Sequence, residues 1–506
     1  MSTLIERYVS QISGSLSCFD RIIITGTIPG VCFAKGMEAY LRARDIRLVD
    51  YPRFAEPLRD KVHQNIKQIA EEADIEIEFI RSPNGFRKEK RIQQVLDERG
   101  VTSGIVHILS AMEACPAFEY HYNKATGRNS LQGRTAKCLH YYVYFLDEEF
   151  GLCYVRIPTW LPFRLQFYCN GHNWLALQLQ LQGITARQMD NTFVMIADWE
   201  KAQALADAFP VERLHRALDR LAARYCPVIE DFAESYHWSL MQVEYATDIV
   251  FARQEDLHPL YDALVHTAIH AVKPENVATF LGRKLHPNFE DELGNNFHTR
   301  IEGMCIKHHM GPASLKMYDK LGLVLRIETT ANDVSFFPHY RTVEHRDGTT
   351  ELKWAPMKKT LYSLSPLREV MQASNRRYLD FLSQLADPAT GIKKVEKLSE
   401  PAVHNDRPYR GFNLFSAADL ALFRALLRGE FAISGFRNSS LRRVLAGYSG
   451  AQISRLLKRL HLHGLIKKVG HTYKYHLTQL GKEAAAAALK LRELVVIPAL
   501  ANLLPA

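Results

Sequence analysis

The chain has 506 residues, with 64 Lys and Arg against 55 Asp and Glu, a formal net charge of +9 and a mean hydropathy of −0.19. This length exceeds one hydrophobic core, so we expect two to four domains. No run approaches eighteen apolar residues, and the start MSTLIERYVSQ lacks the features of a secretory signal, so we expect a cytoplasmic protein without a membrane span. The eight cysteines show no zinc-site spacing.

Strand and helix patterns alternate in the N-terminal part of the chain. We predict strands over Arg21–Thr27, Ile75–Ile80 and Gly104–Ser110, and helices over Ala34–Ala43 and Lys88–Glu98. This order predicts an α/β layer, and we place a first domain at residues 1–130.

A central domain of mixed sheet and helices is expected over residues 131–385. It begins with a long hairpin over 139–169, continues with helices between 172 and 232, and reaches a strand at Trp238–Phe251. Glu244 and Asp248 are four residues apart on that strand, so both side chains project from one face. A helix over Leu257–Val272 follows, and no internal repeat is visible in the sequence.

Three short strands with tight turns carry the most unusual polar residues. They are predicted over Met304–Met310, Ser314–Lys320 and Leu323–Thr330, with turns at Gly311-Pro312 and Gly322. Alternation places Lys316, Tyr318 and Lys320 on one face of the second strand and Arg326, Glu328 and Thr330 on one face of the third. A tyrosine, the adjacent Asp319 and a neighbouring glutamate could hold a divalent metal beside a hydroxyl nucleophile, which is suited to opening a phosphodiester.

These segments resemble the rolling-circle plasmid replication initiators, the conjugative relaxases and the filamentous-phage nicking initiators. That group pairs an early R-x-D-x-x-x-D with a later G-x-x-S, Y-D-K and R-x-E. The matching residues here are Glu244, Asp248, Gly311, Ser314, Tyr318, Asp319, Lys320, Arg326 and Glu328, within about residues 235–345. The sequence differs from the pattern in Glu244 in place of the preferred aspartate, in Gln242 in place of the arginine, and in the absence of a histidine-hydrophobe-histidine motif on a strand.

The resemblance implies a central antiparallel sheet with a nicking site. Tyr318 would attack a DNA phosphate, and Mg²⁺ or Mn²⁺ would be held by Glu244, Asp248, Asp319 and Glu328. Lys316, Lys320 and Arg326 would neutralise charge on the phosphate. The structural alternative is a solvated Tyr-Asp-Lys hairpin and a cross-strand ion pair in Arg-x-Glu.

The basic charge of the chain belongs to one C-terminal module. Residues 412–482 hold twelve Lys or Arg against Asp419 and Glu430. A polar segment with three prolines, placed at 386–411, is predicted to be a flexible linker before it. Charge concentrated in this way is typical of an appended nucleic-acid-binding domain.

The same module has the element order of a winged helix. Helices are predicted from Ser416 to Leu427, over Asn438–Leu445 and after Ser449, followed by a hairpin around Gly470, and a last helix over 483–506. This order resembles the winged helix-turn-helix of MarR-type regulators, in which the third helix enters the major groove. The residues expected to contact DNA are Gln452, Arg455, Lys458, Arg459, Lys467, Lys468, His471, Tyr473 and Lys474.

The combined prediction is a mixed α/β, DNA-binding protein of a mobile element that acts as a metal-dependent tyrosine nicking initiator or relaxase. Two alternatives stay open. One is a non-catalytic MarR-like transcriptional regulator in which the central cluster is structural, and the other is an RNA-binding component. The sequence leaves a homodimer open as well.

Overall fold

The structure is a computed structural model that describes residues 4–81, 85–285, 291–300, 303–385, 388–470, 472–497 and 500. It divides into a first unit, residues 1–386, and a second unit, residues 387–506. Within the described residues, no helix is both long and apolar enough to cross a membrane.

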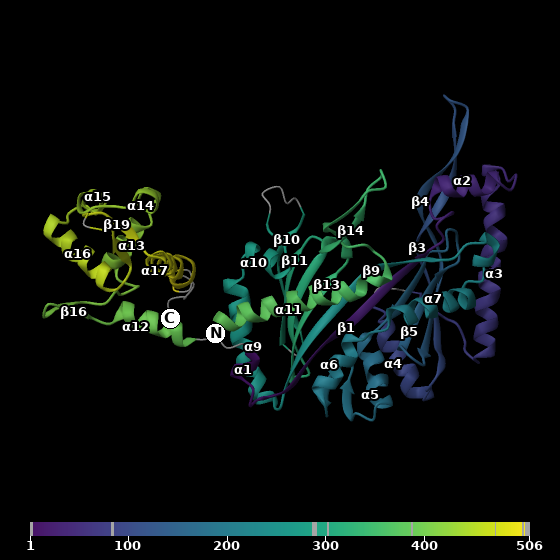
Figure 1. The fold of residues 1–506 in the computed structure, drawn as a ribbon, viewed down its shortest axis with the longest axis horizontal. Coiled ribbons are helices and arrows are strands. Elements are labelled where there is room, and N and C mark those ends of the chain that lie inside the picture. Colours follow the sequence, from purple (N-terminus) through teal and green to yellow (C-terminus); the bar gives the residue numbers. More distant parts are fainter. Residues whose placement is uncertain are drawn as a thin grey trace. The chain divides into compact units, whose positions relative to one another are not determined.

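One eleven-stranded sheet forms the first unit (Figure 1). The strand order is β10-β11-β12-β13-β9-β1-β6-β5-β4-β3-β2. The strands are β1 (Ile12–Thr27), β2 (Glu78–Phe79), β3 (Gly104–Asn123), β4 (Arg128–Asp147), β5 (Gly151–Pro158), β6 (Leu165–Cys169), β9 (His237–Phe251), β10 (Leu293–Arg300), β11 (Gly303–Met310), β12 (Ala313–Lys320) and β13 (Val324–Ala331).

Helices and two small hairpins complete this unit. The hairpins pair β7 (Ala186–Met189) with β8 (Thr192–Ile196) and β14 (Pro338–Glu344) with β15 (Thr350–Pro356). The helices are α1 (Leu4–Arg7), α2 (Ala34–Arg42), α3 (Tyr51–Glu72), α4 (Lys88–Arg99), α5 (Gly171–Leu181), α6 (Trp199–Asp207), α7 (Val211–Tyr225), α8 (Ile229–Phe232), α9 (Gln254–Ala271), α10 (Pro274–Phe280) and α11 (Leu364–Leu385).

The sheet contains the same strand topology twice. In the first half, β1 is followed by the antiparallel meander β3-β4-β5-β6, and β6 returns to pair with β1. In the second half, β9 is followed by the meander β10-β11-β12-β13, and β13 returns to pair with β9. The two first strands, β1 and β9, pair antiparallel in the middle of the sheet. This repeat was not visible in the sequence because the matching strands differ in length and the helices between them differ.

The two faces of the sheet have different environments. On one face, Gln203 of α6 bonds the backbone of Ser17, and Asn375 of α11 bonds Thr247 and Thr329. On the opposite face, α4 packs over β3 and β4, and Val194 of β8 packs on β9 and β13. The predicted acidic residues of β9 and β13 lie on this second face, which we call the site face.

Two predicted domain limits are wrong. The predicted boundary at residue 130 lies inside the β3–β4 pairing, and strands from both sides of it share one sheet. The predicted linker at 386–411 instead contains α12 (Pro388–Ser399) and the hairpin of β16 (Ala402–His404) with β17 (Arg407–Tyr409). Its Leu398 joins the hydrophobic core of the second unit beside Phe412, so burial of Leu398 helps to order the segment.

The second unit has a small helical core with a short hairpin. Its remaining elements are α13 (Ala417–Leu426), α14 (Gly429–Ser434), α15 (Asn438–Val444), α16 (Gly450–Leu462), β18 (Ile466–Lys468), β19 (Tyr475–Leu477) and α17 (Gln479–Lys490), followed by a π-helical segment, Leu491–Val496. Ser449 caps α16 through the backbone N–H of Gln452. The last helix, predicted over residues 483–506, begins at Gln479 in the structure.

The buried His308 gives the first testable prediction. Its ring lies between the Asn295 side chain and the Tyr378 hydroxyl, at 2.6 and 2.8 Å, and burial lowers its pKa from 6.5 to about 4. The unfolded chain therefore takes up a proton first as the pH falls. The contribution of His308 to stability is present above pH 6.5 and is lost toward pH 4, by about 3 kcal/mol.

Denaturant unfolding of wild type and His308→Gln at pH values from 7 to 4 measures this effect. The variant should lose less stability over that range than wild type. His258, with 79% of its side chain exposed, is the control, and His258→Gln should leave the shape of the wild-type curve unchanged. Parallel curves for wild type and His308→Gln would contradict the prediction.

Candidate metal and tyrosine site

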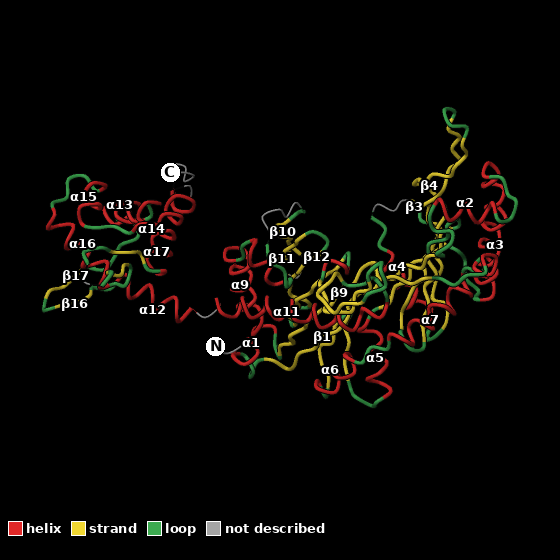
Figure 2. Tube along the Cα trace, turned by 45° about the horizontal axis from the view of Figure 1, so that its top comes forward, coloured by secondary structure: helices red, strands yellow, loops and turns green. Residues whose placement is uncertain are grey.

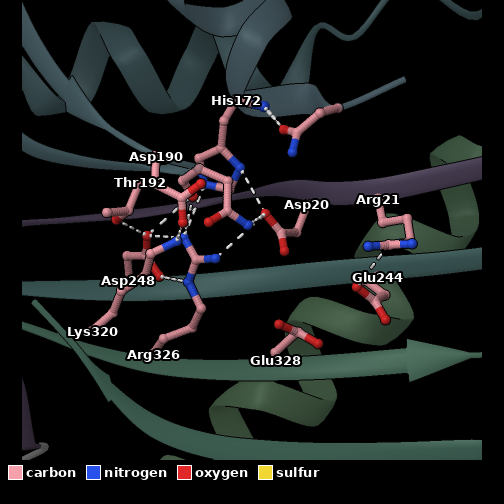
Figure 3. A network of polar contacts seen from close by, with 12 residues as sticks. Asp20, Arg21, His172, Asp190, Thr192, Glu244, Asp248, Lys320, Arg326 and Glu328 are labelled. Carbon is pink, nitrogen blue, oxygen red and sulfur yellow. Dashed lines mark hydrogen bonds and ion pairs between the residues drawn. The ribbon is translucent and has the colours of Figure 1, made fainter. Parts of the chain in front are cut away.

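A β-bulge on β1 brings an unpredicted acid to the site face. Phe19 pairs with Tyr245 and Arg21 pairs with the next residue, Glu244, so Asp20 is the extra residue of the bulge. Such a bulge changes the side-chain alternation locally. Asp20 is 6% exposed and lies between the Arg326–Asp248 pair and the Arg21–Glu244 pair (Figure 3).

Three carboxylates from three strands meet here. One oxygen each of Asp20, Glu244 and Glu328 lies within 4.8 Å of the others. We call these three residues the acidic triad. The structure thus brings together the predicted ligands Glu244 of β9 and Glu328 of β13, which are diagonal neighbours on one face, and adds Asp20 from β1.

Charge repulsion within the triad is visible at Glu244. Burial and the neighbouring Glu328 raise the pKa of Glu244, while Lys316 and Arg21 act in the opposite direction. Arg21 lies 3.5 Å from one Glu244 oxygen and Lys316 lies 3.6 Å from the other. A divalent cation among the three carboxylates would relieve this repulsion further.

Tyr318 and Lys316 bind the same triad member. The Tyr318 hydroxyl donates to Glu328 Oε2 at 2.8 Å, and Lys316 Nζ donates to Glu328 Oε1 at 2.5 Å. Burial and the charge of Glu328 raise the pKa of Tyr318 well above its ordinary value. The predicted nucleophile is therefore a protonated tyrosine, 9% exposed, whose proton points at a carboxylate.

Asp248, a predicted metal ligand, has another role. Arg326 holds it with two hydrogen bonds, from Nε to Oδ1 at 2.6 Å and from Nη2 to Oδ2 at 2.7 Å. Thr192 donates a third, at 2.6 Å. Burial would raise the pKa of Asp248, but Arg326 and His172 lower it below its ordinary value. Asp248 lies outside the triad because its oxygens are occupied by these donors.

Arg326, a predicted phosphate contact, is completely buried and acts within the protein. Besides binding Asp248, it donates to the backbone oxygen of Asn191 at 2.5 Å and lies 3.4 Å from Asp20. His172, at the start of α5, lies 3.2 Å from Asp20, and its pKa is raised well above the ordinary value: burial opposes protonation, but Cys18, Asp20 and Asp248 favour it. We call Asp20, His172, Asp248 and Arg326 the charge network.

Two further predicted site residues lie away from the triad. Asp319 is adjacent to Tyr318 on β12, so strand alternation directs it to the opposite face of the sheet. Asp319 is therefore removed from the predicted set of metal ligands. Lys320 reaches Asp190 in the β7–β8 turn at 2.8 Å. Of the three predicted cationic residues, Lys316 alone contacts the triad glutamates.

Of the predicted DNA-contacting residues of the second unit that the structure describes, Arg459 is buried and the others are exposed or partly exposed. Arg459 is 4% exposed, binds Asp419 through two nitrogens at 2.7 and 2.9 Å, and stacks over Phe412, so its prediction as a DNA contact is wrong. Its position on α16 faces the core formed with the predicted linker. Gln452 completes the cap of α16. Exposed or partly exposed are Arg455, Lys458, Lys467, Lys468, Tyr473 and Lys474, while His471 lies outside the described residues.

Asp20 and His172 are the residues that sequence reasoning missed. Asp20 stands in the apolar strand segment SLSCFDRIII, and a charged residue in such a segment is itself a signal of a special environment. His172 follows Asn170, which caps α5 by accepting from the His172 backbone N–H at 2.7 Å. Nothing in the sequence connects that helix start with strands β9 and β13.

No family model, curated protein or solved structure matches the chain. The resemblance to rolling-circle initiators and MarR-type domains stays a prediction from short motifs.

Proposed function

We propose that this chain is a metal-dependent DNA-nicking protein that uses Tyr318 as its nucleophile. The observation that carries the proposal is the Tyr318 hydroxyl bonded to Glu328, a carboxylate that also belongs to the acidic triad. A nucleophile beside its proton acceptor and a set of metal ligands is the arrangement that phosphodiester transesterification requires.

The triad residues fit Mg²⁺ or Mn²⁺. Both ions prefer carboxylate oxygens, and Asp20, Glu244 and Glu328 supply three on neighbouring strands. Such an ion would stabilise negative charge on a bound phosphate. Two members of the triad, Glu244 and Glu328, are residues that the resemblance to the initiators assigns to metal binding, whereas Asp20 takes the place of Asp248.

The protein groups divide the proposed reaction between them. Tyr318 Oη attacks the phosphorus and passes its proton to Glu328. The new oxygen–phosphorus bond replaces the bond to the 3′ oxygen, which leaves with a proton from water. Lys316, close to Glu328, offers positive charge to the phosphate oxygens. The products are a 5′-phosphotyrosyl adduct and a free 3′ hydroxyl.

Incubation of the full chain with a 5′- and a 3′-labelled single-stranded oligonucleotide pool and Mn²⁺ tests the proposal. A denaturation-resistant protein–DNA adduct carrying only the 3′ segment is expected. DNA binding with no cleavage in Mg²⁺ or Mn²⁺ would instead support the non-catalytic regulator. In that case the ion pairs Arg21–Glu244 and Lys316–Glu328 would have a structural role.

A charge-removing substitution in the triad should weaken the metal site. Glu244→Gln is expected to remove most of the thermal stabilisation that Mn²⁺ gives to wild type, because one of three carboxylates loses its charge. Saturation at a hundred times the Kd corresponds to about 2.7 kcal/mol of stabilisation. The matched control is Asp319→Asn, the acid on the opposite face, which should keep the full Mn²⁺ effect. Equal Mn²⁺ stabilisation of wild type and Glu244→Gln would exclude Glu244 as a ligand.

We further propose that the second unit is a winged helix that binds duplex DNA. Helices α13, α15 and α16, with the short α14 between the first two, precede the β18–β19 hairpin, and Phe436 bridges to Tyr475 of β19, an order that supports a winged helix. Arg455→Ala with Lys458→Ala is expected to weaken duplex binding and to reduce its log–log salt slope by roughly one to two. Preference for RNA over duplex DNA in the same titration would favour the RNA-binding alternative.

A further inference from the structure

The β3–β4 pair continues as a free ribbon beyond the rest of the sheet. β5 pairs with β4 only between His140 and Asp147, whereas β3 and β4 remain paired for twelve more residues, from Met112–Leu139 to Asn123–Arg128. At the usual rise per residue this extension measures roughly 40 Å. Figures 1 and 2 both show it extending past the neighbouring strands.

The outer part of the ribbon has one packed face and one open face. Phe118 and Leu131 lie on the packed face: Phe118 contacts Tyr51 at a ring distance of 6.0 Å, and the Leu131 N–H donates to Glu38 at 2.7 Å. Register and alternation give the open face polar, exposed side chains. These are Glu119, His121, Arg128, Gln132 and Arg134.

A basic hollow adjoins the outer part of the ribbon, and residues of both ribbon faces line it. It has a volume of about 1040 Å³ and lies between α2, residues 46–49 and the ribbon. Arg42 and Arg47 line it together with Arg128, which also belongs to the open face, and Glu38 is the one carboxylate among its described lining residues. Arg42 pairs with Glu38 at 3.3 Å and Arg47 pairs with Asp50 at 2.7 Å, but their side chains are 61% and 75% exposed, so an anionic ligand can still reach the guanidinium groups.

We propose that the β3–β4 ribbon binds duplex DNA, with its open face in the major groove and the hollow against the adjacent phosphate backbone. The major groove of B-form DNA, about 12 Å wide, admits a two-stranded ribbon. The open face presents Arg, Gln and His, which donate hydrogen bonds to base edges, and its one acid, Glu119, is paired with Arg134 at 3.3 Å. Arginines in a hollow suit phosphates. The major groove of A-form RNA is too deep and narrow for such a ribbon. This surface requires neither the nicking reaction nor the second unit.

Affinity measurements on the full chain test the surface. The probe is a fluorescent 30-base-pair DNA duplex, titrated at several salt concentrations. Arg128→Ala with Arg134→Ala, and separately Arg42→Ala with Arg47→Ala, are expected to weaken binding at least fivefold and to lower the salt slope by roughly one to two. The control is Arg253→Ala with Arg376→Ala, which removes the same charge from side chains that are 70% and 80% exposed elsewhere. It should stay within twofold of wild type.

Two results would overturn the proposal. Equal losses in the control would show a net-charge effect, and an equal loss of binding to an RNA duplex would show that the surface does not select DNA. A tethered cleavage reagent gives an independent readout. An iron chelate on Lys124→Cys, at the ribbon tip, should cut the bound duplex, whereas the same chelate on Glu148→Cys, in the turn at the other end of β4, should not. Both positions are exposed, so the fold is retained, and cutting from both or from neither contradicts the docking.

Discussion

Replacing Tyr318 by phenylalanine is expected to abolish adduct formation and strand cleavage, by roughly a thousandfold or more, because the attacking oxygen is removed. The ring and its packing stay. One hydrogen bond to Glu328 is lost, which costs about 1 kcal/mol of stability. The measurement is adduct yield with a labelled oligonucleotide and Mn²⁺, beside duplex affinity, which should stay within about twofold.

The matched control for this prediction is Tyr340→Phe. Tyr340 lies on β14, is 50% exposed and is distant in sequence from the Tyr-Asp-Lys motif. It should cleave as wild type does. Cleavage that survives in Tyr318→Phe and disappears in Tyr340→Phe would move the nucleophile to β14. If Tyr318→Phe loses cleavage but keeps the full Mn²⁺ stabilisation, Tyr318 is needed for the reaction and not for metal binding.

The second large effect is on stability. Arg326→Met should destabilise the first unit by about 3–5 kcal/mol, because Asp248 and Asp20 lose their buried guanidinium partner. Denaturant unfolding followed by a first-unit signal measures the change. Lys359→Met, which breaks the exposed pair with Asp333, removes the same charge and should cost less than about 1 kcal/mol.

A second substitution distinguishes charge from packing. Adding Asp248→Asn to Arg326→Met removes one of the uncompensated carboxylates, so part of the lost stability should return. If the double variant is no more stable than Arg326→Met, loss of packing volume rather than unpaired charge explains the destabilisation.

The strands of the second half of the sheet were predictable because their sequences alternate and their turns contain glycine. β12 and β13 fall within a residue of their predicted bounds, and of the predicted cluster of Tyr318, Asp319 and Glu328, the tyrosine and the glutamate are joined by a hydrogen bond. Alternation is a local property, so it needs no knowledge of the rest of the chain.

The partners of these strands were not predictable in the same way. Which carboxylate Arg326 neutralises depends on the strand order. The sequence alone could not show that Arg326 would pair with Asp248, or that Glu328 would lie near Glu244. Asp20 joins them through a bulge that no residue pattern announces. Arg459 illustrates the same limit: it bonds Asp419, which was assigned to another helix, and the backbone oxygens of Arg410 and Gly411, which were assigned to a linker.

The repeated topology makes the site a product of two halves. Asp20 comes from β1, the first strand of one half, and Glu244 and Glu328 come from β9 and β13 of the other, so no half holds the whole triad. The two halves meet through the β1–β9 ladder alone within the sheet. Two separate polypeptides cut between β8 and β9 would divide Asp20 from Glu244 and Glu328 and would regain the triad only by reassembling along that ladder. Under the proposed metal site, metal affinity would therefore report how the halves associate.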